Sequence, residues 1–222
     1  MPLLLYCVTS SEESVNAAVG LAGAPVLWSD ISGLRVVWSE LKNPESELGT
    51  PEALKKSAVE FHRVLREMLA TVTPIPFRFP TVLDSAEHLQ QHITAEQEQY
   101  REMLARIGDA VQYDIVGTWP DDEQADFATP VSGREYLKRR QQSELRVSAV
   151  GQKLKSVTAG SVKEWRERQE RKQHRWIALV PRECRSAFVS ALRSAGASEG
   201  VKLRLSGPWP PAEFLTPRGD NV

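Results

Sequence analysis

The chain has 222 residues, which is long enough for one large domain or two small ones. Its hydrophobic content of 41% and charged content of 26% are ordinary for a globular protein. Twenty-eight basic residues against 29 acidic ones give a net charge of −1, which argues against a dedicated nucleic-acid-binding protein, because such proteins usually carry a basic excess. The apolar run at 2–8 is too short to span a bilayer, and no basic residue precedes it, so neither a membrane span nor a signal peptide is predicted.

The first half of the chain predicts a strand, a hairpin and two long helices. Residues 3–8 form an apolar run typical of a buried strand, and two β-rich runs at 26–28 and 34–38 flank turn residues, which indicates a hairpin. Thr50 followed by Pro51 is a strong helix start, because the hydroxyl caps free amides and proline suits the first helical position. A second helix is expected to open with capping-box spacing at 84–87 and to end at Gly108.

A proline-rich ribbon at 73–80 separates these two helices. Proline lacks a backbone donor and favours an extended conformation in the residue before it, so the ribbon cannot be a fully paired central strand. Because side chains alternate along an extended chain, Arg78 is expected to point away from the face that holds Ile75, Phe77 and Phe79.

The second half predicts a strand at 111–116, an acidic loop at 119–130 and a helix from about 132 to 155. A further charged helix is expected from the capping-box spacing at 161–164 through about His174. An apolar strand at 176–180, a helix from Pro181 and an alternating strand at 201–205 complete the order, before a second ribbon, Gly-Pro-Trp-Pro-Pro, at 207–211.

This order of elements indicates an α+β fold with two small domains, 1–106 and 107–222. The first is expected to be a ferredoxin-like sheet with helices on one face, and the second an α+β domain with helices, a small sheet and the proline-rich tail.

No catalytic, cofactor or metal site is predicted. His88 and His92 lie one helical turn apart, but a metal would need a third ligand, and the polar residues around them favour a solvated face. The sequence contains no phosphate-binding glycine loop, nucleophile elbow or zinc-protease motif. An acidic cluster lacks the calcium-loop pattern and is interpreted as a solubilising loop; it consists of Asp121, Asp122, Glu123 and Asp126.

The segment 163–175 holds six basic residues and is flanked by Trp165 and Trp176. Phosphate binding is one interpretation. Three glutamates interleave with the basic residues, however, and Glu167 and Arg171 have ion-pair spacing on a helix, which favours a solvated or partner-facing surface.

The aromatic residues of the two ribbons have two interpretations of about equal weight. They pack as core at the ends of the sheets, or they form a stiff edge that docks a partner, since proline-stiffened segments lose little entropy on binding. The candidate docking residues are Phe77, Arg78, Phe79, Trp209, Pro210, Pro211 and Phe214.

Five motifs in this order resemble the gas-vesicle accessory family GvpF/GvpL. They are Phe-His-Arg-Val-Leu at 61–65, Pro-Ile-Pro-Phe-Arg-Phe at 74–79, Gly-Arg-Glu-Tyr-Leu at 133–137, Leu-Val-Pro at 179–181 and Leu-Ser-Gly-Pro-Trp-Pro-Pro-Ala-Glu-Phe at 205–214. The chain departs from the family pattern at Pro80, where glycine is usual, and at Ala212–Glu213, where Tyr-Ser is usual.

The resemblance implies a non-enzymatic, minor structural or assembly protein of gas vesicles, which are gas-filled protein shells that give microbes buoyancy. It implies two domains, partners among the small hydrophobic shell subunit and other accessory proteins, and a place on the gas-facing side of a vesicle in the cytoplasm. Two alternatives stay open. One is a ligand-binding or enzymatic domain with a pocket lined by Arg78, Tyr136 and a histidine, and the other is nucleic-acid binding through 163–175.

Overall fold

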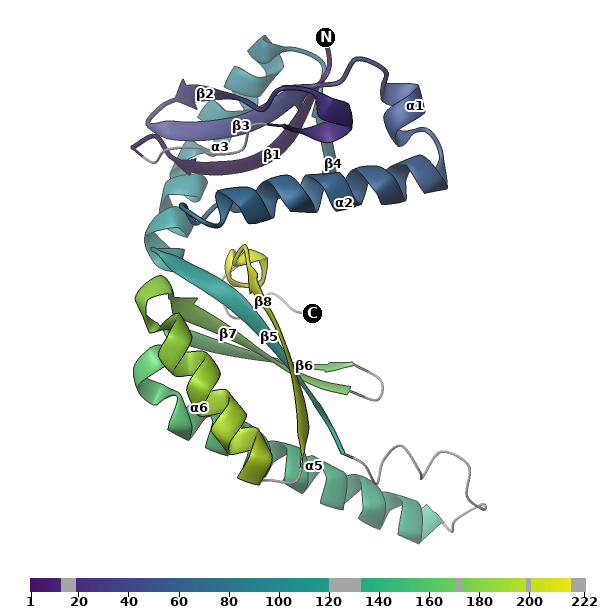
Figure 1. The fold of residues 1–222 in the computed structure, drawn as a ribbon, viewed down its shortest axis with the longest axis vertical. Coiled ribbons are helices and arrows are strands. Elements are labelled where there is room, and N and C mark those ends of the chain that lie inside the picture. Colours follow the sequence, from purple (N-terminus) through teal and green to yellow (C-terminus); the bar gives the residue numbers. More distant parts are fainter. Residues whose placement is uncertain (13–18, 120–132, 171–172, 199–200, 217–222) are drawn as a thin grey trace. The chain divides into compact units, whose positions relative to one another are not determined.

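The computed structural model describes residues 1–12, 19–119, 133–170, 173–198 and 201–216. The chain divides into two compact units: Met1–Ala110 together with the segment that begins at Pro208, and Val111–Gly207 (Figure 1). The predicted division into 1–106 and 107–222 assigned the tail to the second domain, whereas here the tail belongs to the first unit. We describe the units separately as unit 1 and unit 2.

Unit 1 is built on a four-stranded sheet in the order β2-β3-β1-β4. Its strands are β1 (Leu3–Ser10), β2 (Leu27–Ile31), β3 (Leu34–Glu40) and β4 (Ile75–Leu83), and all neighbouring strands are antiparallel. The expected hairpin is therefore β2–β3, and β3 separates β1 from β2 as in ferredoxin-like sheets. Two short elements, η1 (Leu21–Gly23) and α1 (Pro44–Leu48), lie in the connections.

The helix α2 (Pro51–Met68) packs against this sheet and begins as the sequence predicts. The Ala53 amide donates to Thr50 Oγ1 at 3.2 Å, and Pro51 occupies the first turn. A β-bulge between Leu5 and Cys7 interrupts the alternation of side chains along β1. As a result, the neighbouring residues Tyr6 and Cys7 both belong to the core cluster under α2. The buried core under α2 comprises Leu4, Tyr6, Cys7, Leu21, Val26, Val37, Leu41, Phe61, Val64, Leu65, Met68 and Val72.

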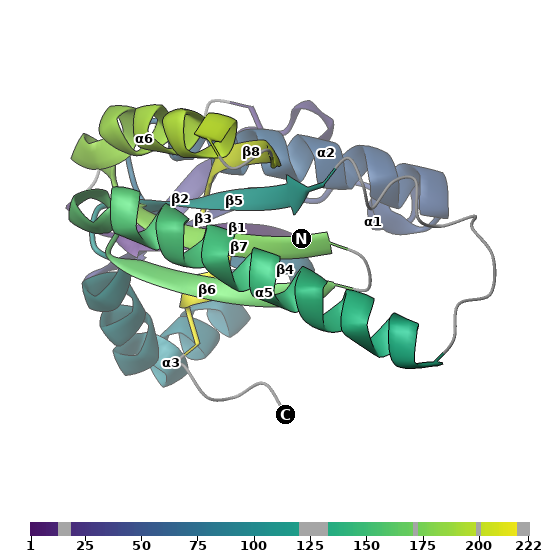
Figure 2. The same ribbon diagram turned by 90° about the horizontal axis from the view of Figure 1, so that it is seen from below.

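The helix α3 (Ala86–Ile107) covers the other side of the unit 1 sheet. Ser85 caps it by accepting the His88 amide at 3.3 Å, and Gly108, with φ of 56°, ends it. The sheet lies between α2 and α3 in Figures 1 and 2. The ferredoxin-like α+β sheet is thus confirmed, but its helices are divided between two faces, where the sequence predicted one. The reason is that β1 is buried along nearly its whole length and needs cover on both sides.

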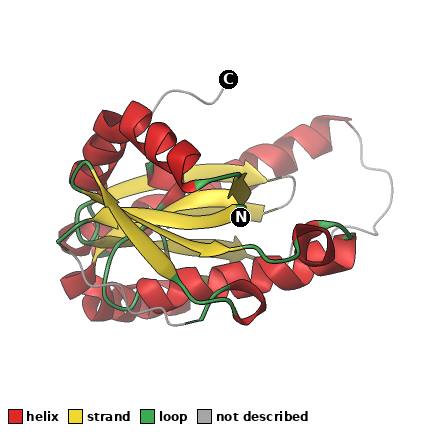
Figure 3. Cartoon of the chain, turned by 90° about the horizontal axis from the view of Figure 1, so that it is seen from above, coloured by secondary structure: helices red, strands yellow, loops and turns green. Residues whose placement is uncertain are grey.

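Unit 2 repeats the topology of unit 1 with different helices. Its elements are β5 (Ala110–Thr118), α5 (Gly133–Val157), β6 (Glu164–Glu170), β7 (Gln173–Pro181), α6 (Arg185–Ser198) and β8 (Lys202–Trp209), with short 3-10 turns η3 (Ala159–Ser161) and η4 (Arg182–Cys184). A last 3-10 turn, η5 (Ala212–Phe214), lies in the tail of unit 1. The strand order is β6-β7-β5-β8, so within each unit the second, third, first and fourth strands lie side by side. The two helices of unit 2 pack on each other and cover one face of the sheet (Figures 2 and 3).

The charged helix predicted for 161–174 is wrong, because this segment forms the β6–β7 hairpin. Ser161 ends the η3 turn instead of capping a helix. Along β6, Trp165 packs against Phe188 of α6 with ring centroids 6.2 Å apart. The expected helical pair between Glu167 and Arg171 falls partly outside the described residues, and Glu167 instead pairs with Lys155 of α5 at 2.5 Å.

Trp176 of β7 is the largest fully buried side chain in the described part of the chain. Two glycines leave room for its ring: a β-carbon on Gly151 of α5 would lie 2.7 Å from Trp176 Nε1, and one on Gly117 of β5 would lie 2.8 Å from Cζ3. Its Nε1 has no hydrogen-bond partner among the described residues. The packing of α5 on the sheet therefore depends on the absence of side chains at these two positions.

We predict that Gly151→Ala lowers the free energy of unfolding by about 1 kcal/mol or more. Overpacking against the buried indole costs roughly 1–3 kcal/mol, which exceeds the helix preference of alanine over glycine of about 1 kcal/mol. Gly160→Ala is the matched control, because a β-carbon there meets nothing within 4 Å. Urea denaturation followed by circular dichroism measures both variants, and equal stability would contradict the packing argument.

Tyr6 generates a second prediction. Its hydroxyl is buried and accepts the Leu21 amide at 2.8 Å, and burial raises its pKa. Tyr6→Phe leaves that buried amide without a partner, which costs about 1–3 kcal/mol. We expect the midpoint of urea unfolding to fall accordingly, and an unchanged midpoint would show that solvent satisfies the Leu21 amide.

Candidate docking surface

The first ribbon forms the edge strand β4, as its prolines require. Its pairing with β1 is interrupted: Pro76 lies opposite Cys7, and the next paired residue, Thr81, lies opposite Leu5. Four residues, 77–80, therefore lie opposite Tyr6 alone and form a large, irregular bulge. The chain leaves the regular pleat at the most aromatic part of the ribbon.

The bulge separates the two phenylalanines that the sequence places on one face. Phe77 packs toward α3, with its ring 6.2 Å from both Tyr100 and His92. Phe79 packs toward α2, with its ring 5.1 Å from Phe61. The prediction that they share a face is wrong, because strand alternation does not hold across a bulge.

Both phenylalanines take part in the packing of unit 1. Phe61 also stacks on Tyr6 at 5.4 Å, so Phe79 extends an aromatic group at the core of the unit. Tyr100 is buried beside Phe77, and burial, reinforced by the Glu96 carboxylate, raises its pKa. Phe77 and Phe79 are each half-buried.

Arg78 lies between them and is exposed. Its carbonyl accepts the Thr81 hydroxyl at 2.6 Å, which ties the bulge together. In the described part of the chain, its guanidinium has no hydrogen bond or ion pair. Arg78 is therefore available to a partner.

The second ribbon runs from the end of β8 into η5. The Ala212 amide donates to the Pro210 carbonyl at 2.8 Å, and the Phe214 amide donates to the Pro211 carbonyl at 3.0 Å. Phe214 is completely buried, whereas Trp209 keeps 39% of its surface exposed. The tail is thus anchored at one end by a buried ring and presents an indole at the other.

The structure divides the seven predicted residues by their exposure. Pro211 and Phe214 are buried, and Pro210 is half-buried. Arg78 and Trp209 are the exposed members of the predicted set. A partner can reach these two without any rearrangement of the segment.

The remaining candidates lie apart from the ribbons. His88 Nδ1 lies 3.7 Å from Asp84, and His92 Nδ1 lies 3.7 Å from Glu96, so each histidine faces a carboxylate four residues away in the chain. Among the described residues, no three or more His, Cys, Asp or Glu side chains come together as a metal site. The acidic cluster at 121–126 lies outside those residues. No helix within them is long and apolar enough to cross a membrane.

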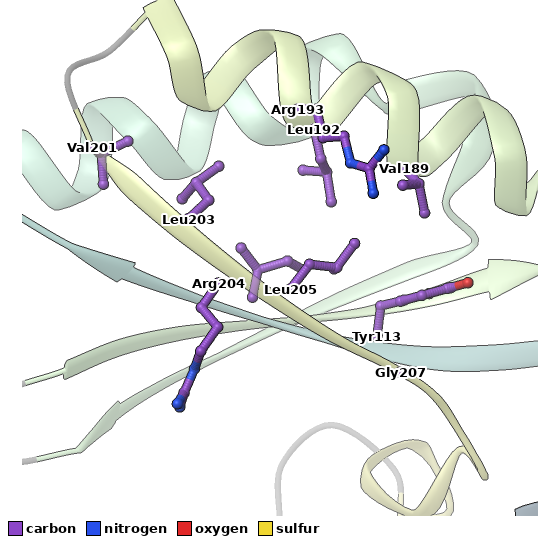
Figure 4. Close-up of a pocket in the computed structure, with 10 residues that line it drawn as sticks. Tyr113, Val189, Leu192, Arg193, Val201, Leu203, Arg204, Leu205 and Gly207 are labelled. Carbon is purple, nitrogen blue, oxygen red and sulfur yellow. The ribbon is translucent and has the colours of Figure 1, made fainter.

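Unit 2 contains two pockets along α6 that the sequence analysis did not identify. One, of ≈ 710 Å³, lies between α6 and the strands β5 and β8 (Figure 4). The other, of ≈ 560 Å³, follows the N-terminal part of α6. Neither is lined by Arg78 or a histidine, which the ligand-binding alternative required. The sequence does contain one pattern that indicates the second pocket. Ser186, Ser190 and Ser194 are spaced four residues apart, which places their hydroxyls on one face of a helix.

The comparisons with known proteins agree with this architecture. Residues 2–216 match the family model described as gas vesicle synthesis protein GvpL/GvpF. Gas vesicle protein L1 of Halobacterium salinarum is 26% identical over 253 residues, covering 95% of this chain and 89% of that protein.

Two solved structures show the same fold. The gas vesicle protein GvpF from Anabaena sp. PCC7120 has a TM-score of 0.77 and 20% identity, with 98% of this chain and 97% of that chain covered. GvpF from Microcystis aeruginosa has a TM-score of 0.74 and 19% identity, with 97% and 99% covered. Because the family model spans nearly the whole sequence and the fold agrees over the same length, the chain belongs to the GvpL/GvpF family of gas vesicle synthesis proteins.

Proposed function

We propose that this protein is a non-enzymatic accessory protein of gas vesicles that binds the small hydrophobic shell subunit and assists nucleation or assembly of the vesicle. Membership of the GvpL/GvpF family supports the vesicle role. The observation that carries the docking role is the exposed indole of Trp209 on a segment that Phe214 anchors. We further propose, from family membership alone, that the protein acts on the gas-facing side of vesicles in the cytoplasm, together with other accessory proteins.

A tryptophan held in this way suits recognition of an apolar partner. Binding energy at interfaces concentrates in a few residues, among which tryptophan and arginine are over-represented. Flanking prolines at 208 and 210 restrict the backbone before a partner arrives, so little conformational entropy is lost on binding. The indole keeps 39% of its surface to bury against the shell subunit.

Arg78 adds a polar contact to the proposed surface. It is exposed on the bulge of β4 in the same unit as the tail. Phe77 and Phe79 hold the bulge from both sides of the sheet through their contacts with α3 and α2. In this proposal the phenylalanines position the ribbon, and Arg78 and Trp209 contact the partner.

We predict opposite roles for the two aromatic residues of the tail. Phe214→Ala removes a fully buried ring, which costs about 3–5 kcal/mol of stability. Trp209→Ala is expected to cost clearly less, because the indole is only partly buried. Thermal and urea unfolding distinguish the two variants. Equal losses would mean that the indole is part of the core and not a docking residue.

Retention of the shell subunit tests the docking role. The protein is co-expressed with the small shell subunit from the same gene neighbourhood and recovered by an affinity tag. Trp209→Ala is expected to reduce the recovered subunit at least about tenfold, because interface tryptophans often contribute 2 kcal/mol or more. Arg78→Ala is expected to give a smaller reduction, because an exposed charge at a rim contributes less.

Trp28→Ala is the matched control. Trp28 is also a half-exposed indole of unit 1, with 50% of its surface exposed, but it lies on β2 and stacks near Arg35. The control variant is expected to retain the subunit like the wild type. If Trp28→Ala reduces the recovered subunit as much as Trp209→Ala does, the effect comes from general surface hydrophobicity. If the wild type retains no subunit, the proposed partner is wrong.

A further inference from the structure

The two pockets of unit 2 adjoin each other along α6. They share three lining residues, Tyr113, Val189 and Arg193. Together they form one continuous surface depression that we call the α6 groove. One part of the α6 groove is apolar and the other is cationic.

The cationic part is lined by Arg182, Arg185 and Arg193, and no acidic residue is among the residues that line it. Arg185 Nε donates to Tyr113 Oη at 3.3 Å, which fixes its position at the floor of the groove. Arg193 makes no hydrogen bond or ion pair with any described residue. Three serines, Ser186, Ser190 and Ser194, add hydroxyl donors between the arginines.

The apolar part lies between α6 and β8. In Figure 4, Leu203 and Leu205 point toward α6, and Arg204 points in the opposite direction. Leu192 and Val189 line the groove from the helix. This part has room for an apolar side chain beside the arginines.

The shape of the groove favours an extended segment over a single small anion. Arg185 and Arg193 are eight positions apart on one helix, which places their backbones about 12 Å apart at 1.5 Å per residue. About four residues of an extended chain, at roughly 3.3 Å each, span that distance. The strand β8 is the last strand of its sheet, so one of its edges is unpaired within the sheet, and its residues 203–205 line the groove.

We propose that the α6 groove binds an extended acidic segment of a partner protein. The segment adds to the free edge of β8 as a further strand, its carboxylates pair with Arg185 and Arg193, and an apolar side chain enters the pocket between α6 and β8. Charge complementarity selects the acidic partner, because the lining carries arginines without acids. This site is in unit 2, and it does not depend on the ribbons of unit 1.

The test uses the full-length protein and a fluorescein-labelled peptide of six residues, Glu-Ser-Val-Ser-Glu-Ser, whose glutamates and valine point to one face of an extended chain. Fluorescence anisotropy at about 0.15 M ionic strength, where distant charges are largely screened, measures its affinity. Arg193→Glu is expected to weaken binding at least about tenfold, because a charge-assisted hydrogen bond contributes about 1.5–3 kcal/mol and 1.4 kcal/mol is tenfold. Arg193 is exposed, so the variant is expected to fold, and circular dichroism checks this.

Arg146→Glu is the matched control. Arg146 is an exposed arginine of α5 in the same unit and does not line either pocket. Binding by this variant is expected to stay within about twofold of the wild type, since screening limits effects of distant charges. Equal losses in both variants would reduce the effect to net charge and overturn the proposal.

Further peptides separate an extended segment from other ligands. Two N-methylated forms are made, one methylated at the glutamates and the valine and the other at the serines. Amides of alternate residues face the neighbouring strand, so one of the two forms cannot pair with β8 and is expected to bind at least about tenfold more weakly. Replacing glutamate by lysine is expected to abolish binding. Undiminished binding of both N-methylated forms would overturn strand addition. Displacement of the peptide by inorganic phosphate at equal ionic strength would show a small-anion site instead, and absence of binding to the wild type would also overturn the proposal.

Failure of this test and failure of the shell-subunit role are distinguishable. Arg193→Glu is expected to leave retention of the shell subunit unchanged, whereas Trp209→Ala is expected to leave the peptide affinity unchanged. Each variant therefore reports on one surface only.

Discussion

The burial of one central strand in each unit determines the arrangement of the rest. β1 is buried on both faces along nearly its whole length, and β5 is buried along almost all of its nine residues. A strand that is buried along its length lies inside its sheet, between two neighbouring strands. In both units, this places the third and fourth strands on either side of the first and leaves the second and fourth strands at the edges.

The two central strands meet this constraint with different chemistry. β1 is almost entirely apolar, and its Tyr6 hydroxyl is hydrogen-bonded to the Ser39 side chain and accepts the Leu21 amide. β5 buries Gln112 and Asp114, and an isolated buried carboxylate would be costly. Arg175 of β7 donates to Asp114 at 2.7 Å, and Gln112 donates to the other carboxylate oxygen at 3.0 Å. The pairing of β5 with β7 thus carries a charge pair that satisfies the buried carboxylate.

Local signals in the sequence were sufficient for most elements of the fold. Thr50 caps α2 as predicted, Gly108 ends α3, and the prolines of the first ribbon place β4 at an edge. These predictions are correct because each depends on the backbone chemistry of one or two residues. The cap of α3 is Ser85, one residue after the position that the capping-box spacing at 84–87 predicts. The family resemblance, read from five motifs in order, predicted the vesicle family that the comparisons confirm.

The predictions that the structure contradicts failed because they depend on contacts between residues far apart in the sequence. β6 is rich in charge and has good helix formers, and only its pairing with the apolar β7 makes it a strand. Phe77 and Phe79 diverge because of a bulge whose length is set by register with β1, which no local pattern records. The α6 groove forms only when α6 packs over β5 and β8, so the sequence spacing of its arginines alone did not identify a site.

The edge strands explain why the candidate surfaces lie where they do. An unpaired edge invites further strands, and proteins block it with prolines, bulges or charge. β4 has prolines and a large, irregular bulge, and five of the seven residues of β6 are charged. β8 has a single proline, Pro208, close to its end, and its earlier part at 202–206 has none. Of these three edges, β8 is therefore the one whose backbone remains suited to pairing, and it is the one that borders a groove lined by arginines. The blocked edge at β4 presents side chains instead, so recognition there depends on Arg78 and on the rigid tail that carries Trp209.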